Sequence, residues 1–120
     1  MVVGIDVYTD TSEKTKRTVT AFISSMNSNV TIPTHDNKKI GCTRWYSRCM
    51  MESKEQKYSD WLHLMMHDAL NKFREKNGGS LPERIFIYRD GVSDSQFPLL
   101  KELEVEPMRE SFAQIDPNYK

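Results

Sequence analysis

The chain has 120 residues, of which 38% are hydrophobic, and its 17 lysines and arginines balance its 17 aspartates and glutamates. This length suits one domain, and the balanced charge gives no support for nucleic-acid binding, and none against it if basic residues cluster locally. Asp6 interrupts the first apolar run, so no signal peptide is expected, and no apolar run is long enough to span a membrane. The composition predicts a soluble, intracellular protein whose two cysteines are reduced thiols.

The first half of the chain predicts three antiparallel strands joined by polar connections. Residues 2–8 have the pattern of a buried strand, residues 18–26 are rich in β-branched and aromatic residues, and residues 43–51 form the third candidate. The polar stretches 9–17 and 27–39 are the expected connections. This pattern is typical of an antiparallel meander.

After residue 57 the hydrophobic period changes and predicts one long helix. Its expected buried face consists of Tyr58, Trp61, Leu62, Met65, Ala69, Leu70 and Phe73. His63 and His67 lie one turn apart, away from this face. A solvated polar face is favoured there over a zinc pair, because Leu64 stands where zinc proteases carry a glutamate. The glycines after Asn77 should end the helix.

A fourth strand, a turn and a further helix are predicted after this helix. Residues 85–88 read as a strand, and Arg89, Asp90 and Gly91 form the turn that follows it. Ser93 is expected to cap a helix over residues 94–103, which Pro107 would end. The residues expected to pack this helix are Phe97, Leu99 and Leu100.

Two of the predicted strands carry an aspartate, Asp6 in the first and Asp90 at the carboxyl end of the later one. Either aspartate alone could simply cap a turn. The order strand, strand, strand, helix, strand, helix is that of the front half of a ribonuclease-H-like fold, in which the first strand and the strand after the helix are neighbours. The two carboxylates would then face one pocket, as a magnesium site requires.

Three segments carry a resemblance to a known family: MVVGIDVY at 1–8, TRWYSR at 43–48 and LPERIFIYRDGVSD at 81–94. They resemble the Piwi domain of the Argonaute superfamily, and its piRNA-using Piwi branch more than its Argonaute branch. The resemblance implies an α/β, ribonuclease-H-like fold, a mixed sheet with flanking helices. Residues 1–120 are then expected to form a partial, C-terminally truncated Piwi domain.

The resemblance also implies a chemistry. In active members an acidic set with a final histidine holds two divalent cations, Mg²⁺ or Mn²⁺, and one phosphodiester bond is cut. Asp6 and Asp90 match the family's first and second aspartates. Lys57 aligns at the position of the family glutamate, and Glu55 could replace it if the chain shifts locally. The final histidine is expected beyond Lys120, so the 120 residues alone are not expected to cleave RNA.

Two functions follow from the resemblance. One is target slicing in piRNA-guided silencing in the germline, which the retained aspartates favour. The other is a non-cleaving module that holds guide and target RNA and recruits silencing factors, which Lys57 favours. The implied partners are guide piRNA, target RNA, the rest of a Piwi protein and Tudor-type proteins bound through an upstream segment, in the cytoplasm, the nucleus or both.

Side chains outside the acidic set could contact RNA. Trp45 and Tyr46 could stack on bases, although burial in the sheet is the favoured interpretation. Basic residues in loops and strands could contact phosphates or could simply be solvated. They are Lys14, Lys16, Arg17, Lys38, Lys39, Arg44 and Arg48.

Overall fold

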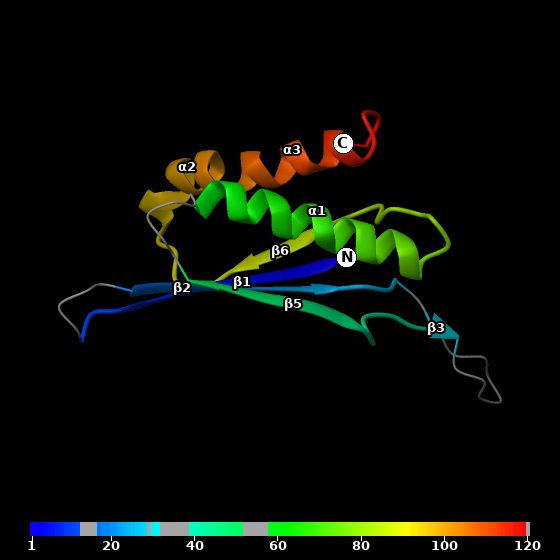
Figure 1. Cartoon of the computed structure of the whole chain (residues 1–120), viewed down its shortest axis with the longest axis horizontal. Coiled ribbons are helices and arrows are strands. Elements are labelled where there is room, and N and C mark those ends of the chain that lie inside the picture. The colour runs from blue at the N-terminus through cyan, green and yellow to red at the C-terminus, as the bar shows by residue number, and fades with distance from the viewer. Residues whose placement is uncertain (13–16, 29, 32–38, 52–57, 120) are drawn as a thin grey trace.

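The computed structural model describes residues 1–12, 17–28, 30–31, 39–51 and 58–119. Its centre is a four-stranded sheet, and the helices of the described residues all lie on one face of it (Figure 1). The strand order is β5-β2-β1-β6. The strands are β1 (Val2–Asp10), β2 (Arg17–Ser25), β5 (Trp45–Met51) and β6 (Phe86–Arg89).

The strand directions confirm the predicted mixed sheet. β1 pairs with β2 antiparallel and with β6 parallel, and β2 pairs with β5 antiparallel. The first strand and the strand after the long helix are therefore neighbours. The first hairpin is longer than expected, since the β1–β2 ladder continues to Asp10 and Arg17. A second, two-stranded sheet pairs β3 (Val30–Thr31) with β4 (Lys39–Ile40), within and just beyond a stretch expected to be only a connection.

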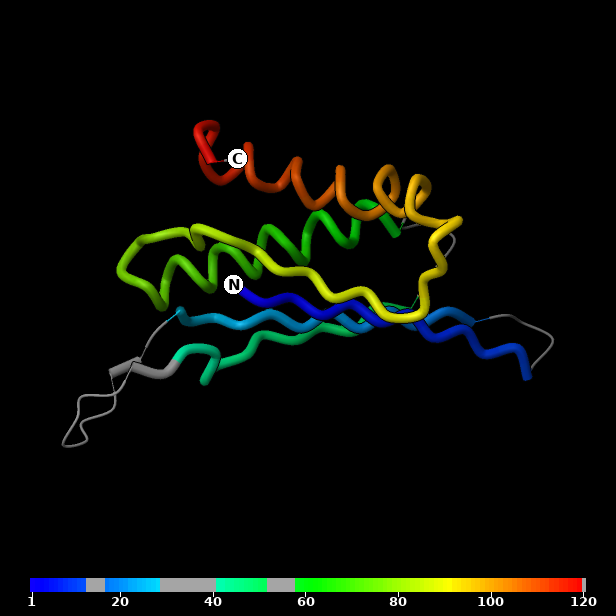
Figure 2. The backbone as a smooth tube through the Cα atoms, turned by 180° about the vertical axis from the view of Figure 1, so that it is seen from behind, coloured from blue at the N-terminus to red at the C-terminus, as the bar shows by residue number. Residues whose placement is uncertain are grey.

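Helix α1 (Tyr58–Lys76) packs across the sheet, as the tube view in Figure 2 also shows. Its buried residues are Trp61, Leu62, Met66, Ala69, Leu70 and Phe73. They meet alternate residues of the strands, among them Val3, Ile5 and Phe22, which point to the helical side. Met66 is buried where Met65 was expected, and Met65 is only partly covered.

The C-terminal part is helical for longer than predicted. After Ser93 come η1 (Asp94–Gln96), α2 (Phe97–Leu100), the π-helical turn η2 (Lys101–Val105) and α3 (Glu106–Ile115). Pro107 does not end the helix, because it lies in the first turn of α3, where its missing N–H is not needed. Phe97 and Leu99 are exposed rather than packed. α3 packs on α1, and its buried residues are Met108 and Ser111.

The predicted stop of α1 is confirmed, with Gly78 at φ +63° and Gly79 at φ +89°. Gly78→Ala is expected to destabilise the helix end by about 1 kcal/mol, because a Cβ disfavours this left-handed backbone. Gly78→Asn should have a smaller effect, since asparagine tolerates that conformation. Hydrogen exchange of the last turn of α1 measures both, with about fivefold faster exchange expected for alanine. Equal rates in the wild type and both variants would contradict this.

Candidate functional site

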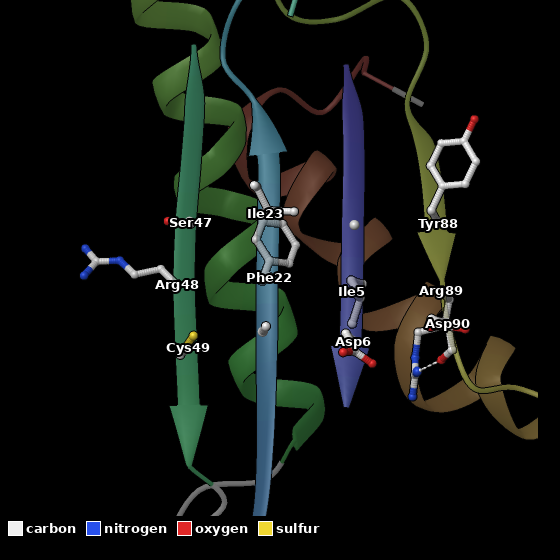
Figure 3. A pocket seen from close by; sticks show the side chains of 12 residues that line it. Ile5, Asp6, Phe22, Ile23, Ser47, Arg48, Cys49, Tyr88, Arg89 and Asp90 are labelled. Carbon is white, nitrogen blue, oxygen red and sulfur yellow. Dashed lines mark hydrogen bonds between the residues drawn. The ribbon is translucent and has the colours of Figure 1, made fainter. Parts of the chain in front are cut away.

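The parallel register of β1 and β6 brings two predicted site residues together. Val2 to Ile5 pair in order with Phe86 to Arg89, so the next positions along are Asp6 and Asp90. The Asp90 N–H donates to the Ile5 carbonyl oxygen at 3.3 Å, which extends the pairing to Asp90 itself. Neighbouring strands lie about 4.8 Å apart, so the two residues stand side by side at one end of the sheet. Figure 3 shows them there.

Side-chain alternation places both aspartates on the face without helices. Val3 and Ile5 are buried under α1, so Gly4 and Asp6 point to the opposite face, and Asp6 is exposed. Asp90 lies two residues after Tyr88 and therefore points to the same face of the sheet as Tyr88, which is 68% exposed. The aspartates thus reach solvent together.

A depression of about 650 Å³ lies over this part of the sheet. β1 contributes Gly4 and Asp6, β2 contributes Ala21 and Ile23, and Asp90 closes one side (Figure 3). The other lining residues are Ile5, Phe22, Ser47, Arg48, Cys49, Tyr88 and Arg89. Since Ala21, which pairs with Asp6, is small, the floor beside Asp6 is open enough for a ligand to approach the carboxylates.

The Asp90 carboxylate is held by the turn that follows β6. Its Oδ1 accepts a hydrogen bond from the Gly91 N–H at 2.7 Å. Gly91 has φ +73°, a backbone conformation that glycine adopts without strain. The Arg-Asp-Gly order seen in the sequence therefore has a local cause, because the glycine turns its own N–H back to the carboxylate.

The donor set suits a hard cation only in part. Two carboxylates on adjacent strands offer the anionic oxygens that Mg²⁺ and Mn²⁺ prefer. Within the described ranges, no group of three or more histidine, cysteine, aspartate or glutamate side chains could hold a metal ion. Glu55 and Lys57, the candidates for the third position, lie outside the described residues.

A buried polar cluster beside Asp90 was missed by sequence reasoning. Arg89 forms an ion pair with Glu104 of η2 at 3.0 Å, and the Tyr58 hydroxyl donates to Glu104 Oε1 at 3.0 Å. The sequence feature that could have revealed this cluster is the helical spacing of Leu100, Glu104 and Met108. This spacing puts the Glu104 carboxylate in the middle of a helix face that packs inward.

Burial, and after it the charge of Glu104, raises the pKa of Tyr58 well above its usual value near 10. Because the pKa of Tyr58 is higher in the folded protein than in the unfolded chain, its hydroxyl contributes to the free energy of unfolding. This contribution is fully present below about pH 10, the unfolded pKa, and is lost as the pH rises from there toward the folded pKa. Tyr58→Phe is therefore expected to remove part of the alkaline destabilisation. Urea midpoints at about pH 8 and about pH 10.5 measure this, and an identical alkaline loss in wild type and variant would contradict it.

Other candidates lie away from the aspartates. His63 is not merely solvated, because its ring nitrogens lie 3.1 Å from the Pro107 carbonyl oxygen and 3.1 Å from Gln114 Oε1, between α1 and α3. His67 Nδ1 is 3.2 Å from the Asn71 side-chain nitrogen. Trp45 was expected to be buried but is 46% exposed, on the edge strand β5.

The basic residues considered for RNA contact are only partly described. Arg44 and Arg48 are exposed, and the Arg48 guanidinium lies over the Tyr46 ring at 5.7 Å from its centre. Arg17 begins β2. Lys14, Lys16 and Lys38 lie outside the described residues, and Lys39 begins β4. No described helix is both long and apolar enough to cross a membrane.

Piwi-like proteins are similar to this chain in sequence. Piwi-like protein Ago3 of Bombyx mori is 38% identical over 120 residues, which is all of this chain and 11% of that protein. Piwi-like protein 1 of Danio rerio is 32% identical over 120 residues and 12% of its length. The chain therefore spans about a tenth of the length of these relatives.

Solved structures share the fold. Kluyveromyces polysporus Argonaute, crystallised with a guide RNA, has a TM-score of 0.69 and 26% identity over 98% of this chain and 12% of its own. The MID-PIWI domains of N. crassa QDE-2 have a TM-score of 0.72 at 22% identity over 98% of this chain and 31% of theirs, a likeness of fold alone. The sequence model of the Piwi domain matches residues 1–120. The chain therefore belongs to the Piwi domain family, which serves in small-RNA-guided silencing.

Proposed function

We propose that the protein works in piRNA-guided RNA silencing and that residues 1–120 supply part of the Piwi domain that cuts the target RNA. The observation that carries this proposal is the β1–β6 register, because it sets two exposed carboxylates side by side over an open depression. Similarity to Piwi-like proteins of Bombyx mori and Danio rerio supports piRNA as the guide.

Asp6 and Asp90 would hold the divalent cations, Mg²⁺ or Mn²⁺, through their carboxylate oxygens. When bound, such ions activate a water molecule and stabilise the leaving oxygen of a phosphodiester. The chain's own contribution is to fix the two carboxylates on paired strands. It also places a small residue, Ala21, opposite Asp6, beneath the approaching RNA backbone. Glu55 is the proposed third carboxylate.

RNA would reach the carboxylates across the face of the sheet that carries no helices. Arg48 is exposed but leads away from the depression (Figure 3), because it shares the helical side of β5 with Tyr46, whose hydroxyl accepts a hydrogen bond from Arg48 Nε at 3.3 Å. Any phosphate contact by Arg48 would therefore lie outside the depression. The guide RNA in the Kluyveromyces polysporus crystal supports a guide as partner. Target RNA, the rest of a Piwi protein and Tudor-type proteins complete the proposed partners, inside the cell.

A second function is favoured by a different observation. By the resemblance, Lys57 aligns at the position of the family glutamate, and an ammonium cannot replace a carboxylate as a metal ligand. The protein would then hold guide and target RNA without cutting and would recruit silencing factors. The two functions share RNA binding and differ only in cleavage.

The deciding experiment loads the longest native form of the protein with a guide RNA and adds an end-labelled target. Cleavage at one phosphodiester bond is expected with Mg²⁺ and none with EDTA, and Asp90→Ala should bind the target but leave it intact. Stable target binding by the wild type without any cleavage would establish the non-cleaving function. Cleavage that survives Asp90→Ala would refute the assignment of Asp90.

A further inference from the structure

The ion pair of Arg89 and Glu104 lies directly behind Asp90. The side chains are 17% and 8% exposed, and Arg89 Nε donates to both carboxylate oxygens of Glu104, at 3.1 and 3.0 Å. Tyr58, at the start of α1, donates its hydroxyl to the same carboxylate at 3.0 Å. Strand β6, helix α1 and the turn η2 are thus joined at one buried point.

The same guanidinium also reaches Asp90. Arg89 Nη1 donates to the main-chain carbonyl oxygen of Asp90, the contact drawn as a dashed line in Figure 3. That carbonyl belongs to the peptide between Asp90 and Gly91, and the N–H of this peptide donates to Asp90 Oδ1 at 2.7 Å. One end of a single peptide is therefore bonded to Arg89 and the other end to the carboxylate. If the peptide rotates, the N–H that holds the carboxylate moves with it.

We infer that Glu104 and Arg89 are positioning residues for the Asp90 carboxylate, with Tyr58 supporting Glu104. Glu104 fixes the guanidinium, the guanidinium fixes the Asp90–Gly91 peptide, and the peptide N–H fixes one carboxylate oxygen. The inference rests on the proposed function, because it takes the Asp90 carboxylate to be a metal ligand. Residues that orient a ligand typically change metal affinity by about 10- to 100-fold when they are altered.

The shape of the guanidinium distinguishes positioning from simple charge pairing. Arginine has several donors in a rigid plane, so it can bond Glu104 with one and the Asp90 carbonyl with another. Lysine keeps the positive charge next to Glu104 but is a single point donor on a flexible stem. Arg89→Lys therefore keeps the buried charges balanced while it releases the peptide that holds Asp90.

The test measures the affinity of the longest native form for Mn²⁺ alone, followed by electron paramagnetic resonance. Arg89→Lys and Glu104→Gln are expected to bind Mn²⁺ about tenfold more weakly or worse. Tyr58→Phe should give a smaller loss, because the ion pair stays in place. Glu102→Gln, an exposed position of the same turn η2, is the matched control and should bind as the wild type does.

Wild-type Mn²⁺ affinity in Arg89→Lys would overturn the inference. Should Glu104→Gln fail to fold, Arg89→Lys carries the test, and its unfolding temperature shows that the fold is kept. Asp90→Asn in the same titration separates the two proposals. If Asp90→Asn loses Mn²⁺ and Arg89→Lys does not, only the positioning role fails. If Asp90→Asn binds Mn²⁺ normally, the proposed metal site itself fails.

Discussion

Replacing Asp6 with asparagine is expected to lower the rate of guide-directed target cleavage by about a thousandfold. The amide keeps the size of the side chain and removes the anionic charge that a divalent cation needs, so the loss reflects chemistry rather than packing. Asp6 is exposed and points away from the core, and the fold should therefore tolerate the change. Single-turnover cleavage with excess loaded protein measures the effect.

The double variant Asp6→Asn/Asp90→Asn gives a sharper form of the same prediction. Two ligands of one site fail together, so the double variant should be little worse than either single one. Asp10→Asn is the matched control, because Asp10 lies on the same strand and bonds Ser12 in a turn. A rate loss in Asp10→Asn as large as that in Asp6→Asn would mean that general charge, and not a metal site, is responsible.

Leu70→Ala is expected to destabilise the domain by about 3 kcal/mol, the loss that a fully buried leucine typically produces. Leu70 lies in the centre of the core between α1 and the sheet, with no exposed surface. Leu64 lies on the same helix and is 48% exposed, so Leu64→Ala should change the free energy of unfolding by less than about 0.5 kcal/mol. Thermal unfolding of both variants provides the comparison, and equal shifts would contradict the assignment of the buried face.

Strong local patterns predicted much of the fold. The apolar run at residues 2–8 predicted a buried strand, in which Val3 and Ile5 are buried, and the pair Gly78-Gly79 predicted the end of α1. The neighbouring placement of β1 and β6 came from the order of elements and from the resemblance, and it is confirmed. These features depend on residues close in sequence or on a fold already known, so the sequence contains their cause.

Predictions failed where packing over a distance decides the outcome. Met65 and Met66 are adjacent on α1, and the orientation of this helix on the sheet buries Met66 and leaves Met65 only partly buried. Trp45 is exposed because β5 is an edge strand and its alternation points this residue to the face without helices. Pro107 was expected to end the last helix. Instead, the π-helical turn η2 comes before it and α3 begins at Glu106, so Pro107 lies in the first turn of α3.

The candidate site also combines a local feature that the sequence predicts with a buried contact between distant elements that it does not. The Asp90–Gly91 turn is local, and the sequence identified it. Glu104 was missed because a carboxylate in an acidic run suggests solvent, whereas its burial depends on Arg89 and Tyr58, which come from other elements. The catalytic roles of Asp6, Asp90 and Glu55 remain predictions.

A crystal structure of the longest native form grown with Mn²⁺ tests the shared metal site most directly. An anomalous-scattering peak should lie in the depression at the end of β1 and β6, at about 2 Å from carboxylate oxygens of both Asp6 and Asp90. The same map would show whether Glu55 completes the ligand set. A peak bound to only one aspartate, or no peak at this end of the sheet at saturating Mn²⁺, would contradict the account.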